Sequence, residues 1–110
     1  MVYERGDVVS APFRFSEIDT FKTRPVVVVS NSAFYGETGS MIVAMITSAN
    51  RSAWPFDLTI ADWAAAGLAK PCLIRLKLAT IALETTEGFI GRIDGQTLKE
   101  LSSRLTKLIT

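Results

Sequence analysis

Histidine is absent from this 110-residue sequence, and Cys72 is its single cysteine. Without histidine the chain cannot form a His-based acid–base pair, a Ser-His-Asp or Cys-His nucleophile, or a His-ligated zinc site. One cysteine cannot close an intrachain disulfide or supply a CxxC metal motif, which excludes disulfide scaffolds and zinc fingers. Because Cys72 adjoins Leu73 and Ile74, we expect a small buried hydrophobic side chain there. Any catalysis must use other groups.

A large excess of charge and long apolar runs are also missing. Twelve Lys and Arg against 11 Asp and Glu give a net charge of +1, so no bulk basic field favours non-specific binding to DNA. The apolar runs at 26–29 and 41–46 are far shorter than the ~18 residues of a membrane span. The first residues show no charged segment followed by an apolar one, as a signal peptide would. We expect a cytoplasmic protein with no membrane partner, no metal and no other cofactor.

The remaining composition is that of one folded unit. Hydrophobic residues make up 48% of the chain and charged residues 21%, with only 4 Pro and 7 Gly, so the chain can bury a core. It contains no repeat, linker or low-complexity tract. We expect a single domain spanning residues 1–110.

Short β-rich segments bounded by turn residues succeed one another, and no helical pattern separates the early ones, which argues against βαβ units. We expect strands at residues 8–13, 25–30, 41–47, 56–60, 72–78 and 80–83, with a long loop at 14–23. The segment 25–30 is apolar on both faces, and we expect it to pair as a hairpin with 41–47 through turns at 31–32 and 36–40. Period-two alternation puts Phe56, Leu58 and Ile60 on one face.

The clearest helix signal lies at the end of the chain. Asp94 has the character of an N-cap, flanked by Ile93 and Leu98 at the positions of a hydrophobic staple. Apolar residues then recur at helical spacing and should dock on the sheet: Leu98, Leu101, Leu105, Leu108 and Ile109. A shorter helical turn is expected near 62–66, closed by a left-handed Gly67. The predicted fold is mainly β, an SH3-like barrel of six or seven short antiparallel strands with a C-terminal α-helix.

Polar residues gather at one predicted end of the hairpin. Arg24-Pro25 precedes the first buried strand, and Thr47-Ser48 ends its expected partner, beside a loop that carries Ser16, Glu17, Asp19, Thr20 and Lys22. Convergent polar groups at one sheet edge are a candidate site. The residues alone leave another interpretation open, in which the arginine makes a local ion pair and Thr-Ser begins a turn.

At these residues the chain resembles the MazF/PemK family of toxin–antitoxin endoribonucleases. The resemblance is carried, in order, by Arg5-Gly6-Asp7-Val8-Val9, by Thr23-Arg24-Pro25-Val26-Val27-Val28-Val29-Ser30-Asn31, by Ile46-Thr47-Ser48, Gly67-Leu68 and Thr80-Ile81, and by Ile90-Gly91-Arg92-Ile93. It covers nearly the whole chain. It implies a homodimer of SH3-like barrels that cleaves single-stranded RNA, often messenger RNA, without metal, and is neutralised by an antitoxin filling the same groove.

The resemblance also implies roles for individual residues. The residues tied to catalysis in the family fall on Arg24 and Thr47, and Ser16-Glu17 keeps two positions of the family's groove loop. Asp19, Lys22 and Ser48 would border the same RNA. Arg75 stands at the position of an additional arginine found in some members, and the alternative interpretation is a charged strand residue that faces outward. This chain departs from the pattern at Lys77, where that branch has an acid, and at Ala79, where an arginine is usual.

The chemistry implied is attack of the ribose 2′-hydroxyl on the adjacent phosphorus, leaving a 2′,3′-cyclic phosphate and a 5′-hydroxyl. Arg24 would stabilise the phosphorane, and Thr47 or Ser48 would donate to a non-bridging oxygen. Arginine is a poor base at neutral pH, so Glu17 and Asp19 are the alternatives for proton transfer.

Two further functions stay open. A non-enzymatic toxin of the same superfamily, similar to CcdB, would act on a protein such as gyrase through residues 108–110, and an inert relative would serve as a binding module. Trp54 and Trp63 are compatible with a barrel end, a dimer contact or a base-stacking surface.

Overall fold

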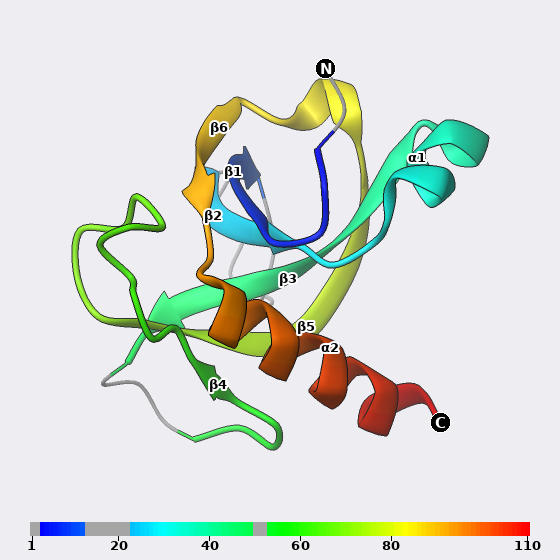
Figure 1. Ribbon diagram of the computed structural model, residues 1–110. Helices are drawn as coiled ribbons and strands as arrows, with labels where there is room; N and C mark the ends of the chain where they lie inside the picture. The colour runs from blue at the N-terminus through cyan, green and yellow to red at the C-terminus, as the bar shows by residue number, and fades with distance from the viewer. Residues whose placement is uncertain (1–2, 13–22, 50–52) are drawn as a thin grey trace.

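Within the described residues, six strands form one curled antiparallel sheet (Figure 1). The computed structural model spans the chain, and the structure describes residues 3–12, 23–49 and 53–110. The strands are β1 (Asp7–Pro12), β2 (Thr23–Val28), β3 (Ser40–Ser48), β4 (Leu58–Thr59), β5 (Cys72–Ala82) and β6 (Gly88–Arg92), in the sheet order β4-β5-β3-β2-β1-β6. The helices are α1 (Ser32–Thr38), α2 (Gly95–Ile109) and a 3₁₀ turn, η1 (Leu83–Thr85). The expected mainly β fold with a C-terminal helix is confirmed.

The sheet buries side chains on both faces, and the alternation of each strand decides which residue goes where. On the face that packs against α2, here called the α2 face, lie Val8, Val27, Ala44, Ile46, Ile74 and Leu76. On the other, here called the second face, lie Val9, Val26, Val28, Met41 and Val43, with Met45 partly buried beside them. The apolar run 26–29 is therefore shared between two cores, as expected for a strand covered on both sides.

The long strand β5 was expected as two strands and is one. It pairs with β3 along its length, but the register shifts between Ala44, which faces Leu78, and Met45, which faces Arg75. Such a bulge bends the strand without ending it. The bend lets one strand serve both cores, because Ile74 and Leu76 belong to the α2 face, while Ala79 and Ile81 pack on the second face.

The connection between β2 and β3 was expected to consist of turns and instead contains the helix α1. The side chain of Asn31 accepts from the backbone N–H of Phe34 (2.9 Å), and Gly39 closes the helix with φ 71°. Both capping signals are present in the sequence, but the helix has seven residues and no buried side chain, so no apolar stripe reveals it. The expected antiparallel pairing of the two strands is confirmed, with Val26 facing Met45.

The terminal helix α2 begins as expected. Asp94 accepts from the backbone N–H of Thr97 (2.9 Å), and Leu98, Leu101 and Leu105 pack on the α2 face. Leu108 and Ile109, expected to dock with them, are 39% and 75% exposed because the helix runs past the sheet (Figure 1). Neither helix among the described residues has the length and apolar character to cross a membrane.

Two shorter expectations are met in part. Gly67 is left-handed (φ 85°) and closes a turn in which Ala66 N–H donates to the Asp62 carbonyl (3.2 Å). Leu58 and Ile60 are buried, but Phe56 does not share their environment. It has φ 66° and is 43% exposed, since the chain turns there before β4 begins.

Candidate functional site

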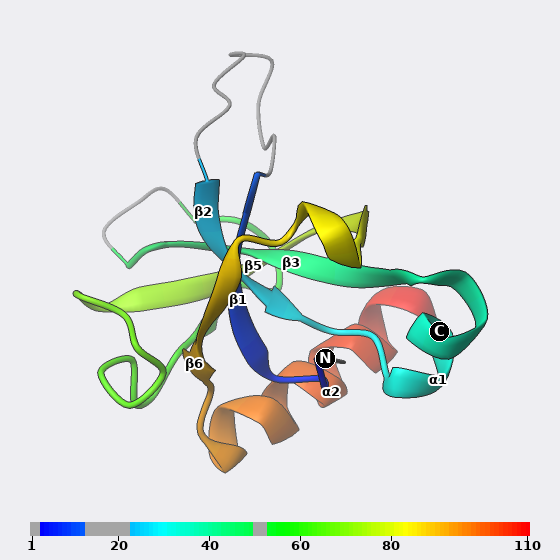
Figure 2. The ribbon, with the colours of Figure 1, turned by 90° about the horizontal axis from the view of Figure 1, so that it is seen from above.

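Arg24 and Thr47 lie at the same end of the β2–β3 pair, as the sequence predicts. The paired residues run from Val28–Val43 to Val26–Met45, two residues short of Arg24 and Thr47. Beyond that point Arg24 pairs with Ala11 of β1, and Thr47 pairs with Leu73 of β5. The two strands diverge toward this end (Figure 2). The backbone of Arg24 is therefore held by β1 and that of Thr47 by β5, and the two residues do not pair with each other.

Alternation assigns both residues to the second face. Arg24 follows the same side as Val26 and Val28, and Thr47 the same side as Val43 and Met45. Arg24 is exposed and Thr47 is half-buried. A guanidinium and a hydroxyl therefore stand on one face of the sheet, at one end, where a bound chain could lie against both.

Ser48 takes the other side of β3. Its neighbour Ile46 and its partner Cys72 belong to the α2 face, and Ser48 lines an open hollow of about 460 Å³ with Ala49, Lys70 and Pro71. The structure thus separates the two hydroxyls that the sequence placed together. The loop candidates Ser16, Glu17, Asp19 and Lys22 lie outside the described residues.

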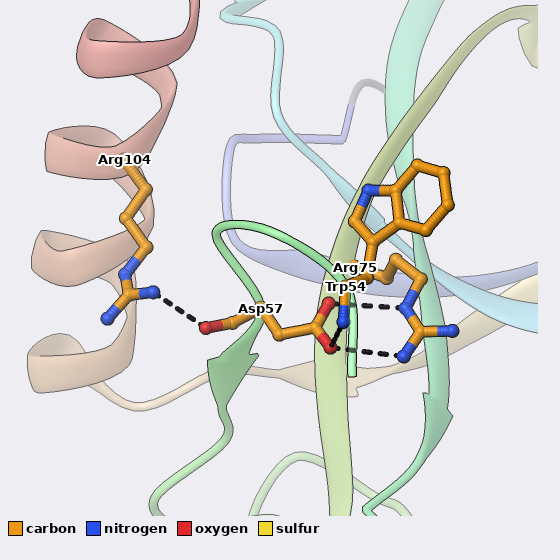
Figure 3. Close-up of polar contacts among 4 residues, drawn as sticks. All are labelled: Trp54, Asp57, Arg75 and Arg104. Carbon is orange, nitrogen blue, oxygen red and sulfur yellow. Dashed lines mark hydrogen bonds and ion pairs between the residues drawn. The ribbon is translucent and has the colours of Figure 1, made fainter. Parts of the chain in front are cut away.

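Arg75 alternates along β5 with Ile74 and Leu76 of the α2 face, so it belongs to the second face, like Thr47. It stands opposite Met45 in the β3–β5 ladder and is 7% exposed, so it is not an outward-facing strand residue. Its Nε and Nη2 donate to Oδ1 and Oδ2 of Asp57 at 3.2 and 3.0 Å (Figure 3). This two-point geometry fixes the guanidinium plane as well as its charge.

Asp57 was missed by the sequence analysis. Its carboxylate also accepts from the backbone N–H of Trp54 (3.0 Å), its own N–H donates to the Trp54 carbonyl (3.1 Å), and its carbonyl accepts from Nη1 of Arg104 (2.6 Å). The carboxylate beside Arg75 therefore comes from the turn before β4, not from position 77, which is lysine. The signal available in the sequence was the lysine at position 77. With no acid at that position, a buried Arg75 must take its carboxylate from another segment of the chain.

Trp54 stands over this ion pair. Its ring lies beside the Arg75 side chain (Figure 3), with the ring centroid 6.0 Å from the guanidinium carbon. The centroid is 4.4 Å from Nζ of Lys77, and the residue is 43% exposed. Both distances fall within the range of cation–π attraction. The turn 54–57 is thereby held to β5 by two side chains and to α2 by a third.

Residues 4–109 match the family described as PemK-like, MazF-like toxin of type II toxin-antitoxin system. The chain belongs to this family. No curated protein sequence matches it significantly.

Solved structures share the fold. MazF of Deinococcus radiodurans superposes with a TM-score of 0.75 at 21% identity, covering 99% of this chain and 97% of that one. A MazE–MazF complex from the same organism gives 0.74 at 23%, covering 99% and 96%. An endoribonuclease in complex with its cognate antitoxin from a mycobacterial species gives 0.72 at 16%, covering 96% and 91%. The chain is thus a toxin of a type II toxin–antitoxin system with the MazF fold.

Cys72 of this toxin is 6% exposed, as expected for a small hydrophobic residue. Burial raises the pKa of its thiol, an effect that nearby Lys70 opposes, and Sγ donates to the Lys70 carbonyl (3.3 Å). A buried thiol with a raised pKa is a poor nucleophile. Across residues 3–12, 23–49 and 53–110, no three Cys, Asp or Glu side chains gather as a metal site.

Proposed function

We propose that this toxin is an endoribonuclease that cleaves single-stranded RNA, with messenger RNA as the expected class, without a metal ion. The placement of Arg24 and Thr47 on one face, at one end of the β2–β3 pair, is the observation that carries the proposal. Membership of the MazF-like toxin family supports it, as does the fold shared with a protein described as an endoribonuclease.

The reaction proposed uses the substrate's own nucleophile. The 2′-oxygen of a ribose bonds to the adjacent phosphorus, and the P–O5′ bond breaks, leaving a 2′,3′-cyclic phosphate and a 5′-hydroxyl. The 2′-hydroxyl loses one proton and O5′ gains one, so no water or metal enters this step. The protein must supply positive charge to the phosphorane and two proton transfers.

Arg24 suits the first task. Its planar guanidinium can donate two parallel hydrogen bonds to non-bridging oxygens, which carry the charge that develops in the transition state. The hydroxyl of Thr47 can donate a third. Glu17 and Asp19 are the proposed sources of a carboxylate base, because an arginine is not deprotonated at neutral pH.

We also propose two protein partners. An antitoxin would cover the second face at Arg24, since the related MazF is found in a complex with MazE. A second copy of the chain would form the homodimer. Light scattering at micromolar concentration tests the dimer, and a monomer would count against a groove that spans two subunits.

The first experiment is cleavage of a mixed-sequence single-stranded RNA in excess EDTA, with the product ends mapped. Arg24→Ala should lower the rate by ~10²-fold or more, since removing one preorganised donor costs that much. Arg24→Lys keeps the charge but not the fork and should recover part of the loss. Thr47→Val should be slower than Thr47→Ser, which keeps the hydroxyl, and Ser48→Ala should lose less than Thr47→Val because Ser48 lies toward the α2 face.

Cutting by the wild type with 5′-hydroxyl products in EDTA supports the proposal. An Arg24→Ala protein that cuts as fast as the wild type contradicts the role of Arg24. A folded, antitoxin-free wild type that cuts no RNA contradicts the enzyme itself.

A second candidate rests on the exposed end of α2. Leu108 and Ile109 present apolar side chains at 39% and 75% exposure, as a toxin acting on a protein target such as gyrase would need. Deleting residues 108–110 should abolish toxicity in that case. If cleavage carries the toxicity, the same deletion leaves it in place and Arg24→Ala removes it.

A further inference from the structure

Trp54 is an exposed aromatic residue held in a fixed place. It opens the turn 54–57, which is tied to β5 by the Asp57–Arg75 ion pair and to α2 by Arg104. Exposure of a large ring normally costs free energy, and here 43% of the residue stays in solvent. A rigid, half-exposed ring is the form that a stacking platform takes.

The ring also lies on the side of the sheet where the proposed active site stands. Arg75 faces Met45, which shares the second face with Thr47, and the Arg75 side chain meets Asp57 and Trp54 there. Thr47 and Arg75 are thus diagonal neighbours across β3 and β5. Trp54 therefore lies on the β5 side of Thr47, whereas Arg24 lies on its β2 side.

Positive charge accompanies the ring. Arg75 is neutralised by Asp57, but among the described residues Lys77 makes no ion pair, and its Nζ lies 4.4 Å from the Trp54 ring centroid. The exposed part of the indole, with an unneutralised ammonium lying over the ring, matches one nucleotide that places its base on the indole and its phosphate near the lysine.

We propose that Trp54 and Lys77 form a nucleotide subsite for single-stranded RNA, in which a base next to the cleaved bond stacks on the indole and its phosphate meets the ammonium. This subsite rests on the proposed ribonuclease function. Stacking reads no hydrogen-bonding edge, so the subsite supplies affinity across sequences instead of selecting one base.

The test uses a single-stranded oligonucleotide with 2′-O-methyl riboses, which binds but cannot be cleaved because its 2′-oxygens carry no proton. Trp54 and Trp63 are the chain's two tryptophans, so Trp63→Phe leaves Trp54 as the sole indole reporter. Titration should quench the Trp54 emission. By anisotropy of a labelled oligonucleotide, Trp54→Ala should raise Kd by about 5- to 150-fold, the range for one stacked base.

Matched variants separate stacking from bulk and from charge. Trp54→Phe keeps a flat ring and should retain most of the affinity, whereas Trp54→Leu keeps apolar bulk alone and should resemble Trp54→Ala. Lys77→Ala should reduce the slope of log Kd against log salt by about 0.7, the value for one phosphate contact on a single strand. In cleavage assays Trp54→Ala should raise KM and leave kcat largely unchanged.

The outcomes are distinct from those that test the ribonuclease. Unchanged Kd in Trp54→Ala, while the wild type still cuts RNA, overturns the subsite and leaves the ribonuclease standing. Loss of dimer in Trp54→Ala by light scattering overturns it as well, because the ring would then pack against a second copy. Anisotropy needs no tryptophan, so the result stands even if Trp63→Phe fails to fold.

Discussion

Arg75 and Asp57 form a two-point ion pair in which both side chains are mostly buried, at 8% and 16% exposure. The pair joins the middle of β5 to the residue before β4, two segments 18 positions apart in the sequence. Both carboxylate oxygens and two guanidinium nitrogens take part. Because each ion compensates the other for the water lost on burial, the effects of substitutions at the two positions on stability should depend strongly on each other.

Removing one partner should therefore cost more than removing both. Asp57→Leu takes the two-point carboxylate partner from the buried Arg75 guanidinium, and Arg75→Met takes the guanidinium from the Asp57 carboxylate; each should lower the free energy of unfolding by about 3–5 kcal/mol. The double variant should be closer to the wild type than the sum of the two losses. Urea unfolding of the four proteins measures the coupling. Losses that simply add would mean that the pair contributes no mutual stabilisation.

Arg104 should matter more than its surface ion pair suggests. Its Nε contacts Glu100 (3.0 Å) at a largely exposed i,i+4 position, while Nη1 donates to the Asp57 carbonyl (2.6 Å). Glu100→Ala should cost about 0.3–0.5 kcal/mol, as for other exposed pairs. Arg104→Ala should cost about 1–3 kcal/mol because the Asp57 carbonyl loses its donor. Equal losses in the two variants, measured by urea unfolding, would contradict a role of Arg104 in holding the turn 54–57.

Gly91 of β6 should be the glycine least able to accept a side chain. A Cβ at this position would lie 2.3 Å from the carbonyl oxygen of Ala66 and 2.6 Å from its carbon, both backbone atoms that cannot rotate away. Gly91→Ala should therefore destabilise the protein by more than about 3 kcal/mol, beyond ordinary overpacking. Gly36 in α1 is the matched control, since nothing lies within 4 Å of its Cβ position and Gly36→Ala should stabilise by about 0.4–1 kcal/mol. Thermal unfolding of both variants checks the contrast.

The features predicted from sequence were those set by local chemistry. Alternation of apolar residues identified β2 and β3, and the Asp94 cap with its staple located α2 to the residue. The helix α1 was not predicted because it is too short to carry an apolar stripe. The partner of Arg75 was not predicted for another reason. Asp57 reaches it because β4 pairs with β5, with Leu58 opposite Ile74, and this long-range pairing is not encoded in spacing along the chain.

For the candidate site, one feature was predicted from the sequence and one was missed. That Arg24 and Thr47 share one end of a strand pair follows from an antiparallel hairpin, which the two apolar runs predicted. That Thr47 and Ser48 face opposite sides follows from strand alternation, a rule available from sequence once the strand was predicted to continue through both residues. Because the expected strand ended at residue 47, Ser48 was not assigned to either face of the sheet.

Asp94 should make α2 sensitive to acid. Burial alone would raise its pKa, but hydrogen bonds from the hydroxyl and backbone N–H of Thr97 and the backbone N–H of Asp62 outweigh it and hold the pKa below its ordinary 3.8. A carboxylate whose pKa is lower in the folded state stabilises fully above the unfolded value, and that contribution is lost as pH falls through the folded value. The effect therefore belongs to the range below about pH 4.

The matched variant is Asp94→Asn, which keeps an oxygen to cap the helix but cannot ionise. At pH 7 the wild type should be more stable by about 0.3–1 kcal/mol, the contribution of a negative charge at a helix N-terminus. Urea unfolding at steps from pH 7 to pH 2 should show this difference shrinking below pH 4, while the other carboxylates titrate alike in both proteins and cancel. Asp94→Ala, which removes the cap itself, should lose about 1 kcal/mol or more at pH 7. A difference between Asp and Asn that stays constant down to pH 2 would show that the charge of Asp94 contributes nothing and that the cap acts through its hydrogen bonds alone.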